Sequence, residues 1–183
     1  MADGQYECID KKLIHRGAII DYYQKTMSLP NGKTEIWDAV EHVGAAAVLA
    51  VMDDGRLLMV RQYRESLGRE LLEIPAGKLD CKGEPFEQAA AREMSEETGY
   101  DAGRIEHLLT FYPTVAYSNE RIEIYAAFDL KKGQQHLDDD EELNVETWKI
   151  SDLVKMIRDG EIVDGKTIAA VMTYAAVYLH GEY

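Results

Sequence analysis

Cysteine and long apolar runs are both scarce in this chain of 183 residues. Its two cysteines, Cys8 and Cys81, are too few and too isolated for a disulfide framework. The first residues, MADGQYECIDKK, lack the apolar core of a secretory signal, and no apolar run reaches membrane-spanning length. These absences argue against a disulfide-stapled secreted scaffold and against a helical membrane protein. We therefore expect a cytoplasmic protein.

Basic residues are also few. The chain has 20 Lys and Arg against 34 Asp and Glu, which gives a formal net charge of −14. A charge of this sign and size argues against nonspecific binding to nucleic acids or anionic membranes. If the substrate is an anion, local arginines and a metal ion must overcome the repulsion.

Repeats, low-complexity segments and linkers are absent from the sequence. Its composition is that of an ordinary globular protein, with 46% hydrophobic and 30% charged residues.

The most informative stretch is residues 77–100, whose second half predicts a helix over residues 86–97. That segment is rich in Ala, Glu, Gln, Arg and Met, which are good helix formers. Pro85 suits the start of this helix and Gly99 suits the position just after its end.

Three acids, Glu93, Glu96 and Glu97, share one face of the predicted helix because the second and third lie three and four residues after the first. Like charges at this spacing repel, and they lie near the helix end at which the dipole disfavours anions. Either this is a solvated acidic face, or it binds a cation that the sequence does not supply. A hard divalent ion with oxygen ligands, above all Mg²⁺, is the natural candidate.

The stretch 92–100 (REMSEETGY), with Gly77 and Glu84 upstream, resembles the Nudix box, G-x5-E-x7-R-E-U-x-E-E-x-G-U. Two departures are visible. Six residues rather than five separate Gly77 from Glu84, and Tyr100 stands where a bulky aliphatic residue is usual. The spacing from Glu84 onward is intact, so the glutamate face matches the motif while the loop after Gly77 is one residue longer.

The remaining chain predicts an N-terminal β arm over residues 1–42 and a catalytic domain over residues 43–183. In the arm, residues 13–23 and 33–39 are expected as β segments on either side of a turn at Asn31-Gly32, a strong hairpin signal. The continuous apolar run 43–52 is typical of a strand buried on both faces. Further strands are expected at residues 56–64, 105–112, 122–130 and 146–150, with loops at 66–70 and 133–140.

Two more helices are expected near the C-terminus. Ser151 is expected to cap one that ends near Arg158, and Asp164 or Thr167 to open a second one that ends near Leu179. One face of the second helix carries an apolar stripe, which suggests that this face packs on the core. The stripe consists of Ile168, Val171, Met172, Ala175 and Leu179. Strands interleaved with helices predict an α/β fold, an α/β/α sandwich around a mixed sheet.

Ahead of the box, Arg64 ends an expected strand, and its guanidinium could bind a phosphate. A surface strand with paired charges is the alternative. Glu73 could orient Arg64 or hold a metal through water, and the backbone carbonyl of Ala76 could be a direct metal ligand.

VRQYR, ELLEIPAG, the box and the arm together resemble the ADP-ribose pyrophosphatase branch of the Nudix hydrolases. The resemblance implies a Nudix fold, a homodimer that exchanges the arm, and Mg²⁺-dependent cleavage of ADP-ribose to AMP and ribose 5-phosphate, with Mn²⁺ as a substitute metal. It also implies roles for residues. The implied metal ligands are Ala76, Glu93, Glu97 and the shared Glu96, and Arg64 is the implied phosphate-binding residue.

The segment after the box departs from this branch, whose members typically show P-S-P-G-x-S-D/E-E there. This chain has PTVAYSNE from residue 113, with Val115 in place of the second proline and Ala116 in place of the glycine. The departure leaves other nucleoside diphosphate sugars, such as GDP-mannose, open as substrates. A non-catalytic ADP-ribose-binding module is a further alternative, but the intact box glutamates argue against it.

An acidic run at residues 138–142 precedes the expected strand at 146–150. Blocks of like charge are usually solvated loops. The resemblance instead implies a catalytic glutamate here, with Glu141 the first candidate and Glu142 the second. If neither acts as the base, Glu96 of the box is the next candidate.

Overall fold

The computed structural model describes residues 5–137 and 142–180. It divides into two compact units, Met1–Gly44 with Tyr112–Arg121, and Ala45–Phe111 with Ile122–Tyr183. Among the described residues, no helix is long and apolar enough to cross a membrane.

The first unit contains an antiparallel sheet in the order β1-β2-β3. The prediction of one β segment over residues 13–23 was wrong, because a turn at Gly17 and Ile20 divides it between two strands; the Gly17 N–H donates to the Ile20 carbonyl at 2.9 Å. The turn at Asn31-Gly32 is present, with Gly32 at φ 82°. The strands are β1 (Glu7–Arg16), β2 (Asp21–Ser28) and β3 (Thr34–Glu41).

The segment Tyr112–Arg121 lies beside β3 in this unit. The Val40 N–H donates to the Tyr117 carbonyl at 2.7 Å, and the Asn119 N–H donates to the Val40 carbonyl at 3.2 Å. The side chain of Asn119 also accepts from the His42 N–H at 2.8 Å. The stretch that departs from the branch pattern is therefore attached to the arm, which sequence reasoning did not anticipate.

The second unit is built on a seven-stranded mixed sheet in the order β12-β5-β4-β10-β9, with β6 paired to β5 and β7 to β4. The β10–β4 pair is parallel and the other pairs are antiparallel. Its strands are β4 (Ala45–Val51), β5 (Leu57–Arg64), β6 (Arg69–Glu73), β7 (Ala76–Lys78), β9 (Arg104–Phe111), β10 (Ile122–Phe128) and β12 (Leu143–Trp148).

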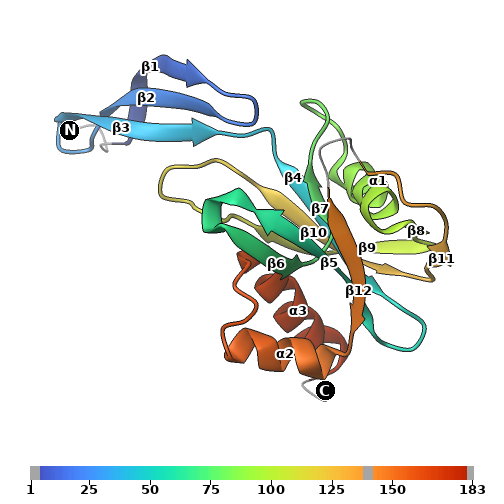
Figure 1. Cartoon of the computed structure of the whole chain (residues 1–183). Helices are drawn as coiled ribbons and strands as arrows, with labels where there is room; N and C mark the ends of the chain where they lie inside the picture. Colours follow the sequence, from blue (N-terminus) through green and yellow to red (C-terminus); the bar gives the residue numbers. More distant parts are fainter. Residues whose placement is uncertain (1–4, 138–141, 181–183) are drawn as a thin grey trace. The chain divides into compact units, whose positions relative to one another are not determined.

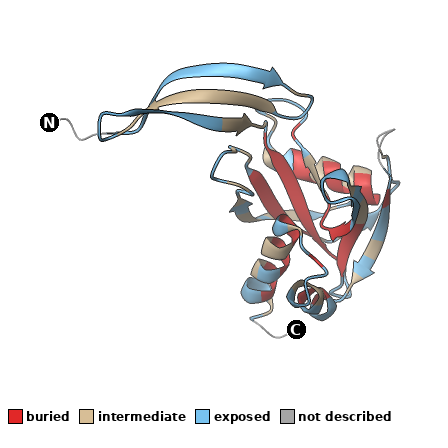
Figure 2. Ribbon diagram, turned by 60° about the vertical axis from the view of Figure 1, so that its left-hand side comes forward, coloured by how far each residue is buried: buried red, intermediate tan, exposed pale blue. Residues whose placement is uncertain are grey.

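β4 is buried on both faces along its whole length, as the apolar run predicted. Alternate residues point to opposite faces of a strand, so Leu49 joins one apolar cluster and Val48 the other. Helix α1 (Phe86–Thr98) covers the second cluster, while α2 (Ile150–Arg158) and α3 (Gly165–Tyr178) cover the first (Figure 1). Figure 2 shows the buried strands between these two layers. The predicted α/β/α sandwich is confirmed.

The helix ends follow local signals with one exception. Pro85 precedes α1 and Gly99 ends it at φ 70°, in the left-handed region that glycine favours. Asp164 caps α3 by accepting from the Thr167 N–H. The expected cap at Ser151 was wrong, because α2 already begins at Ile150, after Lys149.

Several boundaries also differ from the predictions. The expected loop 66–70 contains a short helix, and β6 begins within it; β12 begins earlier than expected. On α3, Val171 and Ala175 are buried, but Met172 is 37% exposed, so it was wrongly assigned to the core. The remaining elements are the 3-10 helix η1 (Glu65–Leu67) and a two-stranded sheet of β8 (Tyr100–Asp101) and β11 (Lys131–Lys132).

Candidate active site

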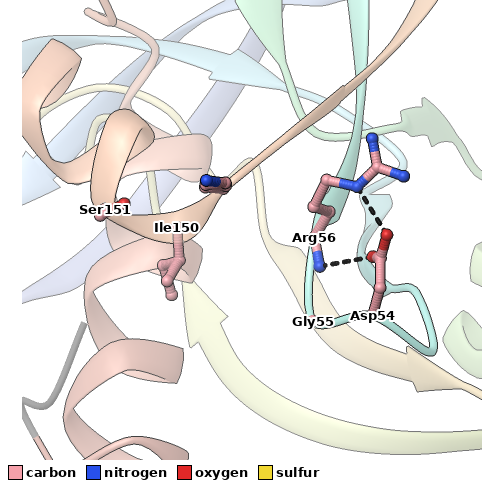
Figure 3. Close-up of a pocket in the computed structure, with 6 residues that line it drawn as sticks. Asp54, Gly55, Arg56, Ile150 and Ser151 are labelled. Atoms are coloured by element: carbon pink, nitrogen blue, oxygen red, sulfur yellow. Dashed lines mark hydrogen bonds and ion pairs between the residues drawn. The ribbon is translucent and has the colours of Figure 1, made fainter.

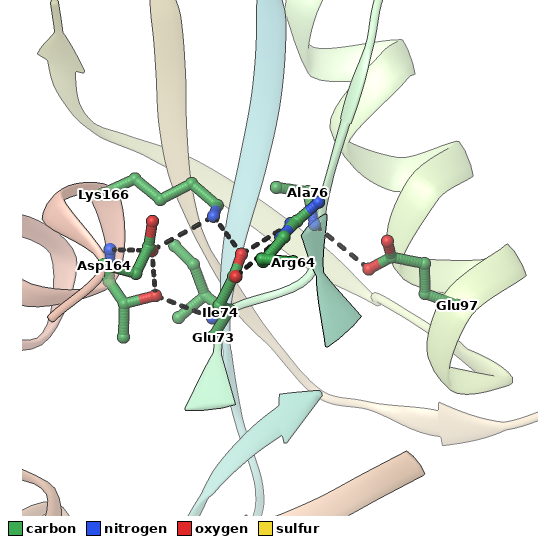
Figure 4. Close-up of polar contacts among 8 residues, drawn as sticks. Arg64, Glu73, Ile74, Ala76, Glu97, Asp164 and Lys166 are labelled. Atoms are coloured by element: carbon green, nitrogen blue, oxygen red, sulfur yellow. Dashed lines mark hydrogen bonds and ion pairs between the residues drawn. The ribbon is translucent and has the colours of Figure 1, made fainter. Parts of the chain in front are cut away.

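Helix α1 presents Glu93 and Glu97 toward the backbone of β7. Glu93 is 9% exposed and Glu97 is 2% exposed. The Ala76 N–H donates to Oε2 of Glu97 at 3.1 Å (Figure 4). A Cβ added to Gly77 would lie 2.1 Å from Cδ of Glu93, so any larger residue there would displace this carboxylate from its present position. The box glycine and the box helix are thus packed directly against each other.

Arg92 supplies positive charge to the acidic face. Its Nη1 donates to Glu93 at 2.8 Å and to Glu96 at 3.0 Å, and its Nε lies 3.4 Å from Glu84 and 3.3 Å from Asp80. Burial acts to lower the pKa of Arg92, but the charge of Glu93 and hydrogen bonds to its acidic partners raise it. Sequence reasoning missed this contribution of the box arginine to the charge of the face, and the predicted Mg²⁺ on the same face stays a prediction.

The donor set suits a hard cation. In the described parts of the chain, no three His, Cys, Asp or Glu side chains are arranged to hold a metal ion. Two buried carboxylates beside the β7 backbone offer only oxygen ligands, and Mg²⁺ is commonly held by one or two carboxylates while it keeps several waters. Glu96 is less enclosed, with 42% of its side chain exposed and Arg92 as its partner.

Arg64, at the end of β5, forms a two-pronged ion pair with Glu73 on β6. Its Nε and Nη2 donate to the two carboxylate oxygens at 2.7 and 2.6 Å. The hydrogen bond to Glu73 raises the pKa of Arg64. The arginine side chain is still 37% exposed, and three of its five N–H groups are not used by Glu73. Of the two roles considered for Glu73, this geometry matches the orientation of Arg64.

Sequence reasoning missed a second cation on Glu73. Nζ of Lys166, in the first turn of α3, donates to Oε2 of Glu73 and lies 3.1 Å from Asp164 (Figure 4). Glu73 is 1% exposed. Burial acts to raise the pKa of Glu73, but Arg64 and Lys166 outweigh it and hold the pKa below its ordinary value. The only sequence signal was a lysine two residues after the helix cap Asp164, which alone predicts a solvated side chain.

Of the acidic run at residues 138–142, only Glu142 belongs to the described residues. Glu141 lies outside the described residues, so its expected role stays a prediction. Glu142 is exposed and directly precedes β12. Among the described residues, the structure therefore brings together Glu93, Glu97 and Ala76, and separately Arg64 and Glu73.

Two hollows are lined by residues other than these groups. One, of about 340 Å³, is formed by the β4–β5 turn at Arg56 and the start of α2 at Ile150 (Figure 3). It lies at the opposite end of β4 from the strand pairing with Gly77. The other, of about 400 Å³, belongs to the first unit and is lined by Ile36, Trp37, Asp38 and Ala116.

Comparison with known proteins defines the class. Residues 41–171 match the NUDIX domain, so the chain belongs to the NUDIX family, whose members generally use divalent metal ions. The chain is 40% identical over 165 residues to the ADP-ribose pyrophosphatase of Bacillus subtilis (strain 168), with 89% of each chain covered. It is 35% identical over 179 residues to the ADP-ribose pyrophosphatase of Mycobacterium tuberculosis, with 97% of this chain and 86% of the relative covered.

A solved structure confirms the fold. The crystal structure of an ADP compounds hydrolase superposes with a TM-score of 0.84 and covers 97% of this chain and 96% of that one. Because the two sequences are only 20% identical, this likeness concerns the fold alone. The resemblance to the Nudix hydrolases and the Nudix fold that it implied are both confirmed.

Proposed function

We propose that this chain hydrolyses the pyrophosphate bond of ADP-ribose to give AMP and ribose 5-phosphate, with Mg²⁺ as its metal. The observation that carries the proposal is the pair of buried box carboxylates, Glu93 and Glu97, packed against Ala76 and Gly77. The two ADP-ribose pyrophosphatases described above support ADP-ribose as the substrate, because their similarity extends over most of each chain.

In this proposal, Glu93, Glu97 and the carbonyl of Ala76 would hold the metal, and Glu96 would join them by turning from Arg92. A divalent cation bound there neutralises pyrophosphate charge and makes a bound water more acidic. The buried position of Glu93 and Glu97 keeps both carboxylates in place before any ligand arrives. Arg92 donates to both Glu93 and Glu96 and so limits the repulsion between these acids.

The other roles concern the substrate and the proton. Arg64 binds a phosphate oxygen and stabilises the charge that develops as water attacks phosphorus. Glu73 fixes the guanidinium for this contact. A loop carboxylate, Glu141 or else Glu142, accepts the proton of the attacking water, and Glu96 takes this role if neither does.

We also propose a cytoplasmic homodimer in which the arm, residues 1–42, packs on a second copy and contributes to its substrate site. Small sheets are marginal without packing partners. Every residue of β1 is exposed in the single chain. The arm also exposes several large apolar side chains; these are Tyr6, Ile9, Leu13, Ile14, Ile19, Ile20, Ile36 and Trp37. A second copy would cover this apolar surface.

The decisive experiment is product release from a panel of nucleoside diphosphate compounds with Mg²⁺, with Mn²⁺ and after chelation. We expect AMP from ADP-ribose with either metal, and none after chelation. A clear preference for GDP-mannose would favour the alternative that the PTVA segment leaves open. Binding of ADP-ribose without hydrolysis of any compound would instead indicate a non-catalytic binding module.

A further inference from the structure

Lys166 on α3 is a buried cation to which the proposed function assigns no role. It is 9% exposed, its Nζ donates to Oε2 of Glu73, and it lies 3.1 Å from Asp164. Burying an ammonium group is costly unless it is paired, and an apolar side chain of similar size often serves stability as well or better. Packing alone therefore does not explain a lysine at this position.

The carboxylate of Glu73 is shared between two cations. Arg64 occupies both oxygens from one side, and Lys166 adds a third donor on Oε2 (Figure 4). Paired with Arg64 alone, Glu73 would cancel most of the positive charge that an incoming phosphate meets. Because Lys166 draws on the same carboxylate, less of the Glu73 charge opposes the exposed edge of Arg64, although Asp164 at 3.1 Å offsets part of the charge of Lys166.

Asp164 and Thr167 brace this arrangement. Oδ2 of Asp164 accepts from the Thr167 N–H at 3.0 Å and from its hydroxyl at 2.6 Å, besides its contact with Lys166. The Thr167 hydroxyl in turn accepts from the Ile74 N–H at 3.0 Å. The first turn of α3 is thus joined to the chain directly after Glu73, which limits how far that carboxylate can turn.

We propose that Lys166 and Asp164 are positioning residues that hold Glu73, and through it keep the free edge of Arg64 aligned and charged for a substrate phosphate. This inference rests on the proposed function of Arg64. Neither residue touches the substrate; both act through the Glu73 carboxylate. A purely structural staple between α3 and the sheet is the competing explanation.

The test is a double-mutant cycle between Lys166 and Arg64, measured with ADP-ribose and Mg²⁺. Lys166→Met should lower kcat/KM about tenfold, which lies within the range of interaction energies measured for residues of one ion-pair network. The loss should be divided between kcat and KM in the same way as the loss in Arg64→Ala. In the Arg64→Ala background, Lys166→Met should have no further effect. Lys155→Met is the matched control, because that lysine is exposed on α2 and pairs only locally with Asp159 at 2.6 Å; it should leave kcat/KM unchanged.

An additive loss in the Arg64→Ala background would overturn the proposal, as would a fall in thermal stability with kcat/KM unchanged. Should Lys166→Met fail to fold, Asp164→Asn keeps the size and a cap oxygen, and it should show the same dependence on Arg64 with a smaller loss.

A second readout separates this inference from the proposed function. The Nε–H signal of Arg64 in ¹⁵N NMR, assigned through its absence in Arg64→Lys, should exchange slowly with water in the unmodified protein and faster in Lys166→Met. Unchanged exchange would refute the positioning role even in a protein that hydrolyses nothing on the panel. Faster exchange together with an inactive unmodified protein would refute only the proposed function.

Discussion

Glu93 and Glu97 are the residues on which the proposed chemistry depends most directly. Both are buried, both lie on the face of α1 toward β7, and both keep contacts that fix their position. The neighbouring Glu96 differs, because 42% of its side chain is exposed. The three acids of one sequence motif therefore divide into two buried carboxylates and one exposed carboxylate.

Glu93→Gln and Glu97→Gln should each remove most of the Mg²⁺-dependent hydrolysis, because an amide is a poorer ligand for a hard cation than a carboxylate. The fold should survive, since the change keeps the size of each side chain. The measurement is kcat/KM at saturating Mg²⁺ together with a thermal melt.

Glu87→Gln provides the control for this pair, because Glu87 lies on the same helix but is exposed. It should behave as the unmodified protein does. Near-normal turnover of either box variant at saturating Mg²⁺ would remove that residue from the metal site.

Glu73 should make stability depend on pH. Its pKa is lowered from the ordinary value of 4.5, so its ionised form stabilises the fold above that pH and the contribution is lost as pH falls through the lower folded pKa. Glu73→Gln should cost about 3–5 kcal/mol near neutral pH, because it leaves Arg64 and Lys166 without their anion. The difference should shrink below about pH 4.

Denaturant unfolding of both proteins across this pH range provides the measurement. A stability difference that stays constant from neutral pH to about pH 3 would show that the ionisation of Glu73 is not what stabilises the fold.

At the scale of elements, local signals predicted the box helix well, whereas contacts between elements were not visible in the sequence. Pro85 and Gly99 mark the ends of α1 because they act through their own backbone geometry. Glu123 shows the opposite case. It lies on the buried strand β10 at 3% exposure, and its carboxylate contacts His107 at 2.6 Å and Thr110 at 2.8 Å on β9. Only strand register brings these residues together.

For the segment before β12, substitutions can distinguish a catalytic glutamate from a general effect of negative charge. If Glu141 or Glu142 is the general base, its change to Gln should lower kcat by about 10²–10⁴-fold and leave substrate affinity nearly intact. The amide keeps the size of the side chain but cannot accept the proton. Single-turnover rates and ADP-ribose binding would measure the two effects separately.

Asp138→Asn is the control, since it removes the same charge from the outer end of the run. A charge in a solvated acidic run is worth about 1 kcal/mol or less, so this interpretation of the run predicts only a few-fold change in rate for Asp138→Asn. If all three variants show the same small effect, the catalytic interpretation of the loop fails and Glu96 becomes the next candidate for the base.

At the scale of the whole molecule, the net charge of −14 contrasts with an anionic substrate. In the proposed function, Arg64 with the support of Lys166 meets this contrast locally, together with a divalent cation held by the box carboxylates. The apolar surface of the arm also concerns the whole molecule, because it is exposed to water in the single chain.

A homodimer built through the arm should be visible by light scattering at micromolar concentration. Ile36→Glu places a charge on an apolar side chain of β3 that is 66% exposed in the single chain, so it should shift the protein toward monomer. Val177→Glu is the control, because that residue is similarly exposed at 56% but lies on α3. A fully active monomer of the unmodified protein would contradict the proposed assembly.

The sequence by itself determined the sandwich, the α1 helix with its ends, and the glutamates of its face. These depend on spacing within a few turns of chain and on residue types with strong backbone preferences. It also predicted Arg64 and Glu73 as candidates, because both lie close to the box along the chain.

Only the tertiary structure decided that Lys166 joins Glu73, a residue 93 positions earlier, and that residues 112–121 attach to the arm. Contacts of this kind form when separate elements pack, and no local period or cap encodes them. A lysine after a helix cap has the same sequence pattern whether it points to water or into a buried carboxylate. The physical difference is the desolvated anion that packing places beside it.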